Sequence, residues 1–447
     1  MSKVYDIVGV GFGPANIALA ALLEEERAYE DVLFLEGAKT PLWQSEMLFE
    51  NALDIHSNIQ NIPHRDLATL RSPRSRFTFL NYLHETGLLL EHLNMDLLMP
   101  MRPDFAAYIR WVSEQLAHLV RTGKAVRGVS MLDEAHSHVY RIDTYDGDAI
   151  FARHVVLGTG RDPLIPEAFE ESLETGRVFH LTRFNSCSRR LLAEGARKFA
   201  VIGSSQSAVE ILLQLSKVEP RLELHSIFRR FAYPLKDTSP FMSEIYFPQF
   251  TDLYYNADKA LKQRIDRDVV RTNYGACDMD VLEELYRQIY YDRLHGSDLI
   301  RVRRMSEVRE VAADETGVTL VVENHETGRT ERDRFDGVVL ATGFRNIGPG
   351  RDQVRVPAIV RDMTEAFALD PDGCVAANRE YLAALRPDLG RAGGLVLNGL
   401  CETSHGMGDA GSVSLLSLRA KTIVDALREL DAGVTRCPRT GMILEDA

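Results

Sequence analysis

Three glycines at alternate positions, Gly9, Gly11 and Gly13, separate a short apolar run from a stretch with helical apolar spacing. A glycine-rich turn between a strand and a helix lets the backbone approach a pyrophosphate, which the N–H groups at the helix N-terminus then bind. We assign the tight turn to Gly9 and the close approach to Gly11. Pro14 replaces the usual last glycine and suits a first helical turn, where its missing N–H has no partner. Glu36 closes the next apolar run, where a carboxylate can bind a ribose hydroxyl.

A second apolar run, small-residue turn and helical stretch begins near residue 199. Its turn residues are Gly203, Ser204, Ser205, Gln206 and Ser207. The strand that follows ends in Arg229-Arg230 rather than in a carboxylate, which favours a nucleotide with a 2′-phosphate. The first motif alone is also compatible with an ordinary turn between a strand and a helix. The arginine pair is also compatible with a basic turn that is exposed to solvent. Together the two motifs predict sites for FAD and for NADPH.

The composition describes a globular protein of several domains. The chain has 447 residues, of which 45% are hydrophobic and 26% charged, so two or three domains are expected. A net charge of −13 without a basic cluster argues against a nucleic-acid partner. No apolar stretch is long enough to span a membrane. The 5 cysteines include no C-x-x-C pair, so we expect no metal site and a reducing, cytoplasmic setting.

The order of the expected elements predicts an α/β fold with two Rossmann-like dinucleotide-binding domains. An amphipathic helix is expected over 105–119, hairpin strands over 139–143 and 149–157, and a final helix over 414–430. The strand at 338–344 leads back to the first domain, which makes that domain discontinuous. The expected division is 1–194 for FAD, 195–340 for NADPH and 341–447 for the second part of the FAD domain. A smaller substrate-binding region combines segments 41–83 and 236–292.

A more specific pattern lies in the first of these segments. It reads Asp66-Leu67-x-Thr69-Leu70-Arg71-x-Pro73-x-Ser75-x-Phe77-Thr78-Phe79-Leu80-Asn81-Tyr82-Leu83. With the opening Gly-Val-Gly-Phe-Gly-Pro-Ala-Asn, it resembles the flavin-dependent N-hydroxylating monooxygenases that act on the side-chain amine of ornithine or lysine. Further matches are Leu235-Lys236-Asp237, Thr272-Asn273-Tyr274, Ala341-Thr342-Gly343-Phe344 and His405-Gly406. The resemblance covers nearly the whole chain.

The resemblance implies a reaction, its cofactors and several site residues. In that family NADPH reduces FAD, the reduced flavin captures O₂ as a C4a-hydroperoxide, and a neutral amine attacks the distal oxygen. The products enter siderophore or other specialised-metabolite pathways, and the enzymes tend to be homo-oligomers, often tetramers. Gln60 falls on the glutamine beside the flavin ring, where it would donate a hydrogen bond during catalysis. The remaining positions expected to bind cofactor are Trp43, Lys236, Thr342, Gly343 and Asp409.

The sequence departs from the family pattern on the substrate side. Arg65 stands where a lysine pairs with the substrate carboxylate, and Ser243 stands where an asparagine contacts the substrate, whereas Asn273 is retained. The usual Thr-His-Gly-Leu-Ser-Asp-Thr run appears as the altered segment 404–412. Arginine still binds a carboxylate, but as a longer bidentate fork. Ornithine or lysine is therefore the first expectation, with another amino acid or a simple amine as the alternative.

Two other functions share these features. A flavin monooxygenase that oxidises sulfur or a ketone would use the same cofactors, but the signature around His180 lacks its first aromatic residue. An FAD-binding redox sensor would bind FAD without oxidising NADPH. The side chains of Ser204 and Ser205 would favour it if they crowded the second pyrophosphate. A disulfide reductase is disfavoured because the sequence has no redox cysteine pair.

Overall fold

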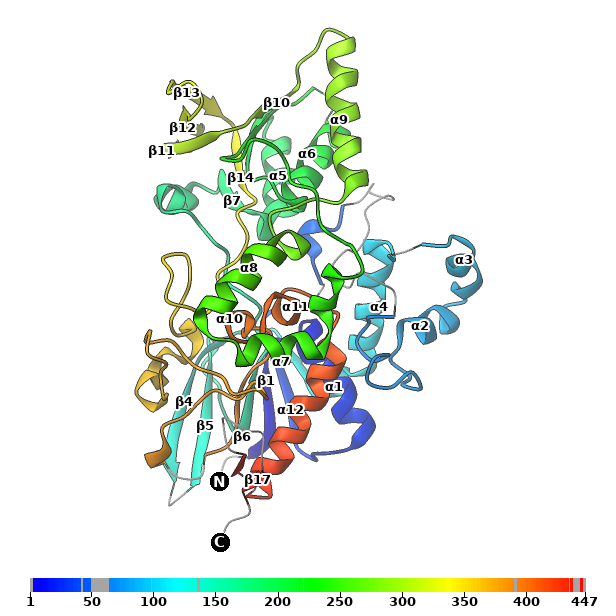
Figure 1. The fold of residues 1–447 in the computed structure, drawn as a ribbon, viewed down its shortest axis with the longest axis vertical. Helices are drawn as coiled ribbons and strands as arrows, with labels where there is room; N and C mark the ends of the chain where they lie inside the picture. The colour runs from blue at the N-terminus through cyan, green and yellow to red at the C-terminus, as the bar shows by residue number, and fades with distance from the viewer. Residues whose placement is uncertain are drawn as a thin grey trace.

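The computed structural model describes residues 3–41, 43–49, 64–97, 99–134, 137–219, 221–389, 392–433, 435–436 and 443–444. Two bodies built on parallel sheets lie end to end, with a group of helices between them (Figure 1). The helices are α1 Pro14–Glu26, α2 Phe79–Glu85, α3 Leu89–Asn94, α4 Arg102–Gln115, α5 Phe184–Ala193, α6 Gln206–Val218, α7 Pro248–Asn256, α8 Lys259–Asn273, α9 Met279–Leu294, α10 Glu402–His405, α11 Met407–Ala410 and α12 Leu416–Asp431.

The first sheet begins at the N-terminus and is completed near the other end of the chain. Its strands are β1 Val4–Val10, β2 Val32–Glu36, β3 Val120–Thr122, β4 Val126–Glu134, β5 Ser137–Thr144, β6 Ala149–Leu157 and β15 Leu395–Leu397. Strands β3, β2, β1, β6 and β15 form a parallel Rossmann-like core, and the β4–β5 hairpin pairs antiparallel with β6. The return of β15 to this sheet is what a discontinuous first domain requires.

The second sheet is entirely parallel, in the order β10-β9-β8-β14-β7. Its strands are β7 Val178–His180, β8 Lys198–Ile202, β9 Glu223–Ile227, β10 Ile300–Arg303 and β14 Gly337–Leu340. The antiparallel strands β11 Ser306–Asp314, β12 Gly317–Asn324 and β13 Thr330–Phe335 form a third sheet, and β16 Thr435–Arg436 pairs with β17 Ile443–Leu444. Because β7 precedes residue 195, the second sheet begins before the expected boundary. The division at 194 and 340 itself remains a prediction.

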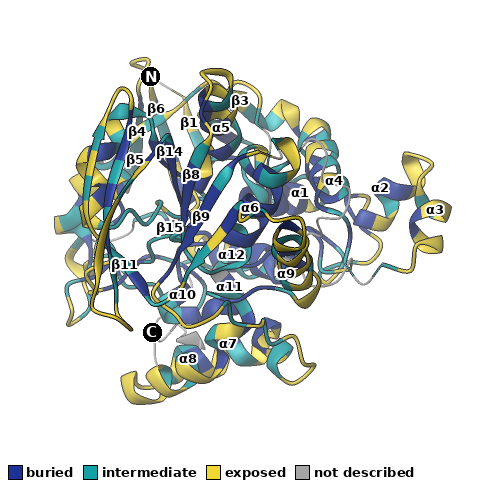
Figure 2. Cartoon of the chain, turned by 90° about the horizontal axis from the view of Figure 1, so that it is seen from above, coloured by how far each residue is buried: buried dark blue, intermediate teal, exposed yellow. Residues whose placement is uncertain are grey.

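Helix α1 is buried all round because its sequence is apolar on every side. Residues 16–23 are all buried, between the first sheet and helix α12. Pro14 is its first residue, as predicted. The expected final helix is α12, and the expected amphipathic helix is α4, which begins three residues earlier than predicted. Helices α2 and α3 project to one side of the molecule, and α3 is largely exposed (Figure 2).

Among the described residues, the contacts between the two bodies include an antiparallel pairing of the two connecting segments and a buried ion pair. Leu164 N donates to Gly343 O at 2.9 Å, and Arg345 N donates to Asp162 O at 2.8 Å. Arg102 of α4 makes a bidentate pair with Glu210 of α6, with N–O distances of 2.9 and 2.7 Å. These contacts fix the carboxyl ends of the two parallel sheets relative to one another. Within the described part of the chain, no helix is long and apolar enough to cross a membrane.

Candidate functional site

The first glycine turn is made by Gly11 rather than by Gly9. Strand β1 continues to Val10, so Gly9 lies inside the sheet, where an added Cβ would overlap the ring of Phe34. Gly11 has a φ of +82°, and an added Cβ would lie 2.6 Å from Gly158 O. The assignment of the tight turn to Gly9 was therefore wrong. Gly9 is required by packing within the sheet, and Gly11 by the turn.

A cavity of about 350 Å³ opens at the N-terminus of α1. Gly13 is the N-cap of that helix, and no described atom lies within 4 Å of a Cβ added to it. The carboxylate of Glu36 lies at the cavity wall, where Oε2 accepts from Phe12 N and Oε1 from Ala38 N, each at 2.8 Å. The cavity also contacts Gly11, Pro14, 158–161, 398–399 and 411–413. An open helix N-terminus beside a fixed carboxylate fits the pyrophosphate and ribose of a dinucleotide.

The carboxylate of Asp409, a predicted cofactor contact, is fully buried inside the protein. It accepts from Tyr381 Oη at 2.8 Å and pairs with Arg419 Nη1 at 3.1 Å. Arg419 contacts the 350 Å³ cavity, whereas Asp409 does not. Among the described residues, Arg419 Nε has no hydrogen-bond partner. Sequence reasoning missed Arg419, because α12 also contains Lys421 and Arg428 and no local pattern marks which of these cations is buried. A direct contact between Asp409 and cofactor remains a prediction.

Replacing Asp409 with asparagine is expected to destabilise the protein by about 3–5 kcal/mol, because it leaves the buried Arg419 without its counter-charge. Arg419 would then be held less firmly against the cavity, and FAD would dissociate more readily. Chemical denaturation and the flavin absorbance retained after gel filtration measure the two effects. Asp388→Asn is the matched control, since it removes an exposed pair with Arg386 and should cost less than about 1 kcal/mol. Equal effects of the two substitutions would contradict the assignment.

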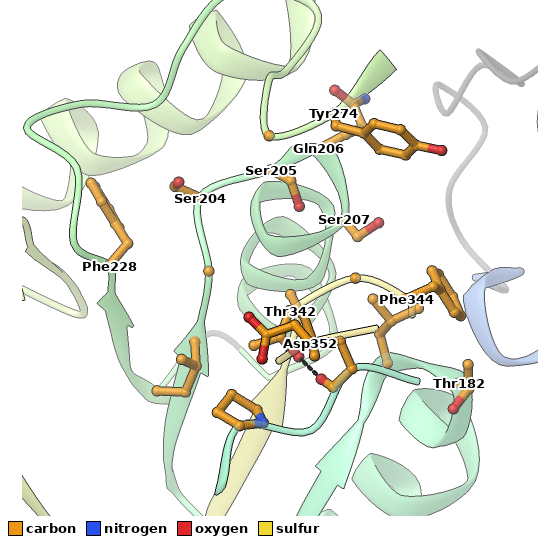
Figure 3. Close-up of a pocket in the computed structure, with 18 of the residues that line it drawn as sticks. Thr182, Ser204, Ser205, Gln206, Ser207, Phe228, Tyr274, Thr342, Phe344 and Asp352 are labelled. Carbon is orange, nitrogen blue, oxygen red and sulfur yellow. Dashed lines mark hydrogen bonds between the residues drawn. The ribbon is translucent and has the colours of Figure 1, made fainter. Parts of the chain in front are cut away.

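The second nucleotide motif opens into a larger cavity of about 1110 Å³ between the two bodies. Gly203 has a φ of +137°, and an added Cβ would lie 2.5 Å from Ala341 O, so only glycine fits this turn. Figure 3 shows Ser204, Ser205 and Ser207 around the N-terminal end of α6. The predicted residues that line this cavity are Gly203, Ser204, Ser205, Gln206, Ser207, Arg229, Arg230, Lys236, Asn273, Thr342 and Gly343.

One of these side chains, Gln206, organises the turn itself, whereas that of Ser205 faces the cavity. Gln206 Oε1 accepts from Asp278 N at 2.8 Å, and its Nε2 donates to Glu210 at 3.0 Å. Gln206 therefore fixes α6 against the start of α9. In the described structure the side chain of Ser205 does not cap α6, although Ser205 is its N-cap residue. Its hydroxyl group lies at the cavity, where it can donate to a phosphate.

Cations surround the end of β9, where the 2′-phosphate of NADPH is expected. The side chain of Arg229 is 77% exposed and lies 3.8 Å from Glu307. The side chain of Arg230 lies beside Gly275. Lys236 is buried, 3.9 Å from Asp278, and burial lowers the pKa of its ammonium group. All three cations line the 1110 Å³ cavity, and this arrangement fits a phosphorylated ribose.

A partly buried polar cluster that sequence reasoning missed lies where the two cavities meet. Arg161 Nη1 donates to Tyr274 Oη at 2.9 Å and to Asn346 Oδ1 and Glu402 Oε2 at 3.1 Å each. Tyr274 Oη also donates to Glu402, and Asn346 Nδ2 donates to Glu402 Oε1 at 2.7 Å. Burial raises the pKa of Glu402. We call these four residues the Arg161 cluster. Arg161 borders both cavities, which places a fixed cation between the expected cofactors.

His180 has a structural role beside the returning strand. Its Nε2 lies 2.9 Å from Gly343 O, which can only accept, so neutral His180 carries its proton on Nε2. Its Nδ1 lies 3.1 Å from the hydroxyl group of Thr182. Thr342, on the same returning segment, donates through Oγ1 to Leu164 O at 2.5 Å (Figure 3). Thr342 and Gly343 therefore form hydrogen bonds that stabilise the segment connecting the two bodies, and both residues lie at the cavity wall.

The stability of the protein is expected to fall as the pH is lowered from about 7 to about 5, partly because of His180. Burial lowers the pKa of His180 from 6.5 to about 4, so unfolding takes up a proton between those values. His405, also buried, has a pKa of about 4 and acts with the same sign. His180→Gln retains a donor for Gly343 O and should reduce the pH slope by at most about 1.4 kcal/mol per pH unit, with the largest reduction near pH 5 and little near pH 7. Urea midpoints measured across this range test it. An unchanged slope in the variant would contradict the assignment.

The predicted substrate residues do not all line one cavity. Asn273 lines the 1110 Å³ cavity and donates through Nδ2 to Met407 O at 3.3 Å. The guanidinium group of Arg65 lies 5.4 Å from the ring centroid of Tyr246. Among the described residues, Arg65 Nη1 is buried without a hydrogen-bond partner, and burial lowers the pKa of Arg65. Ser243 lies on the adjacent short helix, η5 Met242–Tyr246. Arg65 is half-buried as a whole, and an anion beside it would accept from its buried Nη1 donor.

Two further predicted residues are not placed at a cofactor. Trp43 packs edge-on against Phe105, with ring centroids 5.6 Å apart, and is absent from the walls of both cavities. Gln60 lies outside the described residues. The roles predicted for Trp43 and Gln60 therefore remain predictions. In the part of the chain that the structure describes, no group of three or more His, Cys, Asp or Glu side chains is arranged to hold a metal ion.

The sequence is similar to one protein family, both in a model of the whole family and in individual proteins. A sequence model of the family described as L-lysine 6-monooxygenase/L-ornithine 5-monooxygenase matches residues 3–346. The L-ornithine N(5)-monooxygenase of Pseudomonas aeruginosa is 31% identical over 434 residues, covering 95% of this chain and 94% of that protein.

Solved structures extend the similarity to the fold. The ornithine N-hydroxylase of Kutzneria sp. 744, in a complex with reduced FAD, NADP⁺ and L-ornithine, superposes with a TM-score of 0.87 at 29% identity, covering 96% of this chain and 100% of that one. The L-lysine 6-monooxygenase of Pseudomonas syringae superposes with a TM-score of 0.82 at 29% identity, covering 95% and 99%. The α/β fold with two Rossmann-like units is thus confirmed, and the chain belongs to the L-lysine 6-monooxygenase/L-ornithine 5-monooxygenase family.

Proposed function

We propose that this protein is a flavin monooxygenase that uses NADPH and O₂ to hydroxylate the side-chain primary amine of an amino acid. The observation that carries the proposal is the pair of cavities, each of which begins at a glycine turn and a helix N-terminus. Both are bordered by Arg161 and Gly411, so the reactive ends of two dinucleotides can meet there. Membership of the family supports FAD and NADPH as the cofactors.

The residues around the first cavity would hold FAD. Gly11 and the N-terminus of α1 receive its pyrophosphate, and Glu36 its ribose. When bound and reduced, the flavin supplies the activation of O₂. Arg419 adds a cation to the same cavity wall, and Asp409 positions it. Gln60 remains our candidate for the hydrogen bond to the flavin ring.

The residues around the second cavity would hold NADPH. Ser204, Ser205 and Ser207 present hydroxyl groups at the N-terminus of α6, and Arg229 and Arg230 lie where the 2′-phosphate is expected. Lys236 contributes a third cation to the same wall. Because the serine residues line a cavity of about 1110 Å³, they do not argue for a redox sensor that is unable to bind NADPH.

The substrate would be anchored by its carboxylate and positioned by its amine. Arg65 is the proposed carboxylate partner, because its half-buried guanidinium group has a buried donor, Nη1, without a partner among the described residues. Asn273 and Ser243 would contact the rest of the substrate. The amine must be neutral to act as a nucleophile, and its removal from water on binding favours the uncharged form. Ornithine and lysine are the leading substrates, and another amino acid or a simple amine is the alternative.

The wider setting follows from the same family membership. We propose a cytoplasmic enzyme of siderophore or other specialised-metabolite biosynthesis that assembles as a homo-oligomer, with a tetramer as the first expectation. Light scattering of the purified protein tests the assembly directly.

A panel assay tests the proposed reaction. The purified protein with FAD and NADPH is offered ornithine, lysine, shorter diamino acids, acidic amino acids and simple amines, while hydroxylamine, hydrogen peroxide and NADPH are followed. Hydroxylamine from an amino acid with a side-chain amine is the expected result. Flavin reduction by NADPH without hydroxylamine from any amine would overturn the proposal. Oxygenation of a sulfide or a ketone instead would indicate the related flavin monooxygenase reaction.

A further inference from the structure

Three glycines of the segment 406–411 pack directly against the helices on the substrate side. An added Cβ on Gly406 would lie 2.8 Å from the ring of Phe250 in α7. On Gly408 it would overlap the carbonyl oxygen of Ile245 in η5 and lie 2.8 Å from that carbonyl carbon. On Gly411 it would overlap Tyr274 Oη and lie 2.5 Å from Asn273 Nδ2. We call Gly406, Gly408 and Gly411 the glycine seam.

Only one glycine of the seam is explained by its backbone. Gly406 has a φ of +90°, which strongly favours glycine. Gly408 does not have a positive φ, and Gly411 has a φ of −87°, a value that any residue adopts. Close packing is therefore what requires glycine at these two positions. The family run quoted above has a serine where Gly408 stands, and a side chain at that position cannot coexist with this placement of η5.

The elements that meet the seam carry the proposed substrate residues. Helix η5 holds Ser243 and Tyr246, and the Tyr246 ring supports the guanidinium group of Arg65. The end of α8 holds Asn273, which donates to Met407 O within the segment. Gly411 itself borders both nucleotide cavities. The seam therefore fixes how far the proposed substrate anchors lie from the point where the cofactors meet.

We propose that Gly408 and Gly411 determine the length of the amine that the enzyme accepts, by letting η5 and the end of α8 approach the cofactor side closely. This inference rests on the proposed function. A Cβ at either position forces the substrate-side wall outward by on the order of 1 Å, because non-bonded atoms need more than about 3 Å. An alkyl chain gains a similar length, about 1.3 Å, with each methylene. The site of either variant should therefore favour a homologue one methylene longer.

The experiment compares kcat/KM for L-2,4-diaminobutyrate, L-ornithine and L-lysine in the wild type and in Gly408→Ala. The expected result is a shift of at least about 10-fold in the ratio of longer to shorter homologue, since one methylene is worth about 10- to 200-fold in such pockets. Flavin reduction by NADPH without substrate should be unchanged. An unchanged ratio, or a shift towards the shorter homologue, would overturn the inference.

A control and a second variant keep the test decisive. Gly128→Ala, on β4, has a Cβ position 3.8 Å from its nearest described neighbour and should leave the ratio unchanged. If Gly408→Ala does not retain FAD, the same ratio measured in Gly411→Ala decides, because its added Cβ meets the side chains of Tyr274 and Asn273 rather than a backbone carbonyl group. The absence of hydroxylamine from the wild type would overturn the proposed function itself. Hydroxylamine formation with ratios that neither variant shifts would overturn only the role of the seam.

Discussion

Replacing Gly11 with alanine is expected to abolish the retention of FAD. Alanine at a φ of +82° costs about 1–2 kcal/mol, and its Cβ would also lie 2.6 Å from Gly158 O. The turn must then open, which moves both walls of the 350 Å³ cavity away from the positions that fit a pyrophosphate. We expect FAD affinity to fall at least about 100-fold, which corresponds to about 2.7 kcal/mol. Flavin absorbance after gel filtration and titration with FAD measure the loss.

Gly147→Ala separates the effect of the clash from that of the backbone. Gly147 has a φ of +93°, but no described atom lies within 4 Å of its Cβ position. It lies in the turn between β5 and β6, at the opposite end of β6 from the cavity residue Gly158. This control carries the same conformational cost as Gly11→Ala and should retain FAD like the wild type. If both variants lose FAD equally, general destabilisation explains the result, which would contradict a specific role of the Gly11 turn in binding FAD.

Replacing Arg65 with methionine is expected to raise the KM for L-ornithine or L-lysine on the order of 100-fold. A charge-assisted contact between a guanidinium and a carboxylate is worth about 1.5–3 kcal/mol, and more when it is buried. The rate of flavin reduction by NADPH should not change, because Arg65 lines neither nucleotide cavity. The unfolding midpoint should stay equal or rise, because the substitution removes a buried donor that has no partner among the described residues.

A substrate without a carboxylate provides the control for Arg65. Cadaverine and putrescine carry the amine but not the anion, so their KM values should be the same in the wild type and in Arg65→Met. Arg65→Lys should restore part of the affinity for the amino acids, because a cation remains, although its geometry differs. An equal rise in KM for the diamines would show that Arg65 shapes the pocket rather than binding the carboxylate.

The local nucleotide motifs could be predicted because strand, turn and helix are adjacent in the chain. Pro14 begins α1, Glu36 ends β2, and the Gly203 turn opens into a cavity, as the spacing implied. The assignment of Gly9 to the turn was wrong because the sequence does not show where a strand of continuous apolar residues ends. The structure extends β1 to Val10 and leaves the turn to Gly11.

The polar groups around the cavities could not be predicted in the same way. The Arg161 cluster joins positions 161, 274, 346 and 402, which four separate segments bring together. Asp409 was selected from its motif, but the structure gives it Arg419 and Tyr381 as partners instead of placing it at the cavity wall. Burial and pairing depend on how distant segments pack, and no local pattern encodes them.

The sequence by itself determined the fold class, the two nucleotide motifs and the family, because each of these is written in short runs of adjacent residues. Only the tertiary structure decided which side chains face a cavity and which form ion pairs or hydrogen bonds inside the protein. It also shows why glycine is required at Gly408 and Gly411. The physical reason is that steric contact and desolvation act across space. A Cβ at position 408 causes no steric clash with its neighbours in the sequence. It becomes impossible once the carbonyl group of Ile245, far away in the sequence, packs against that position.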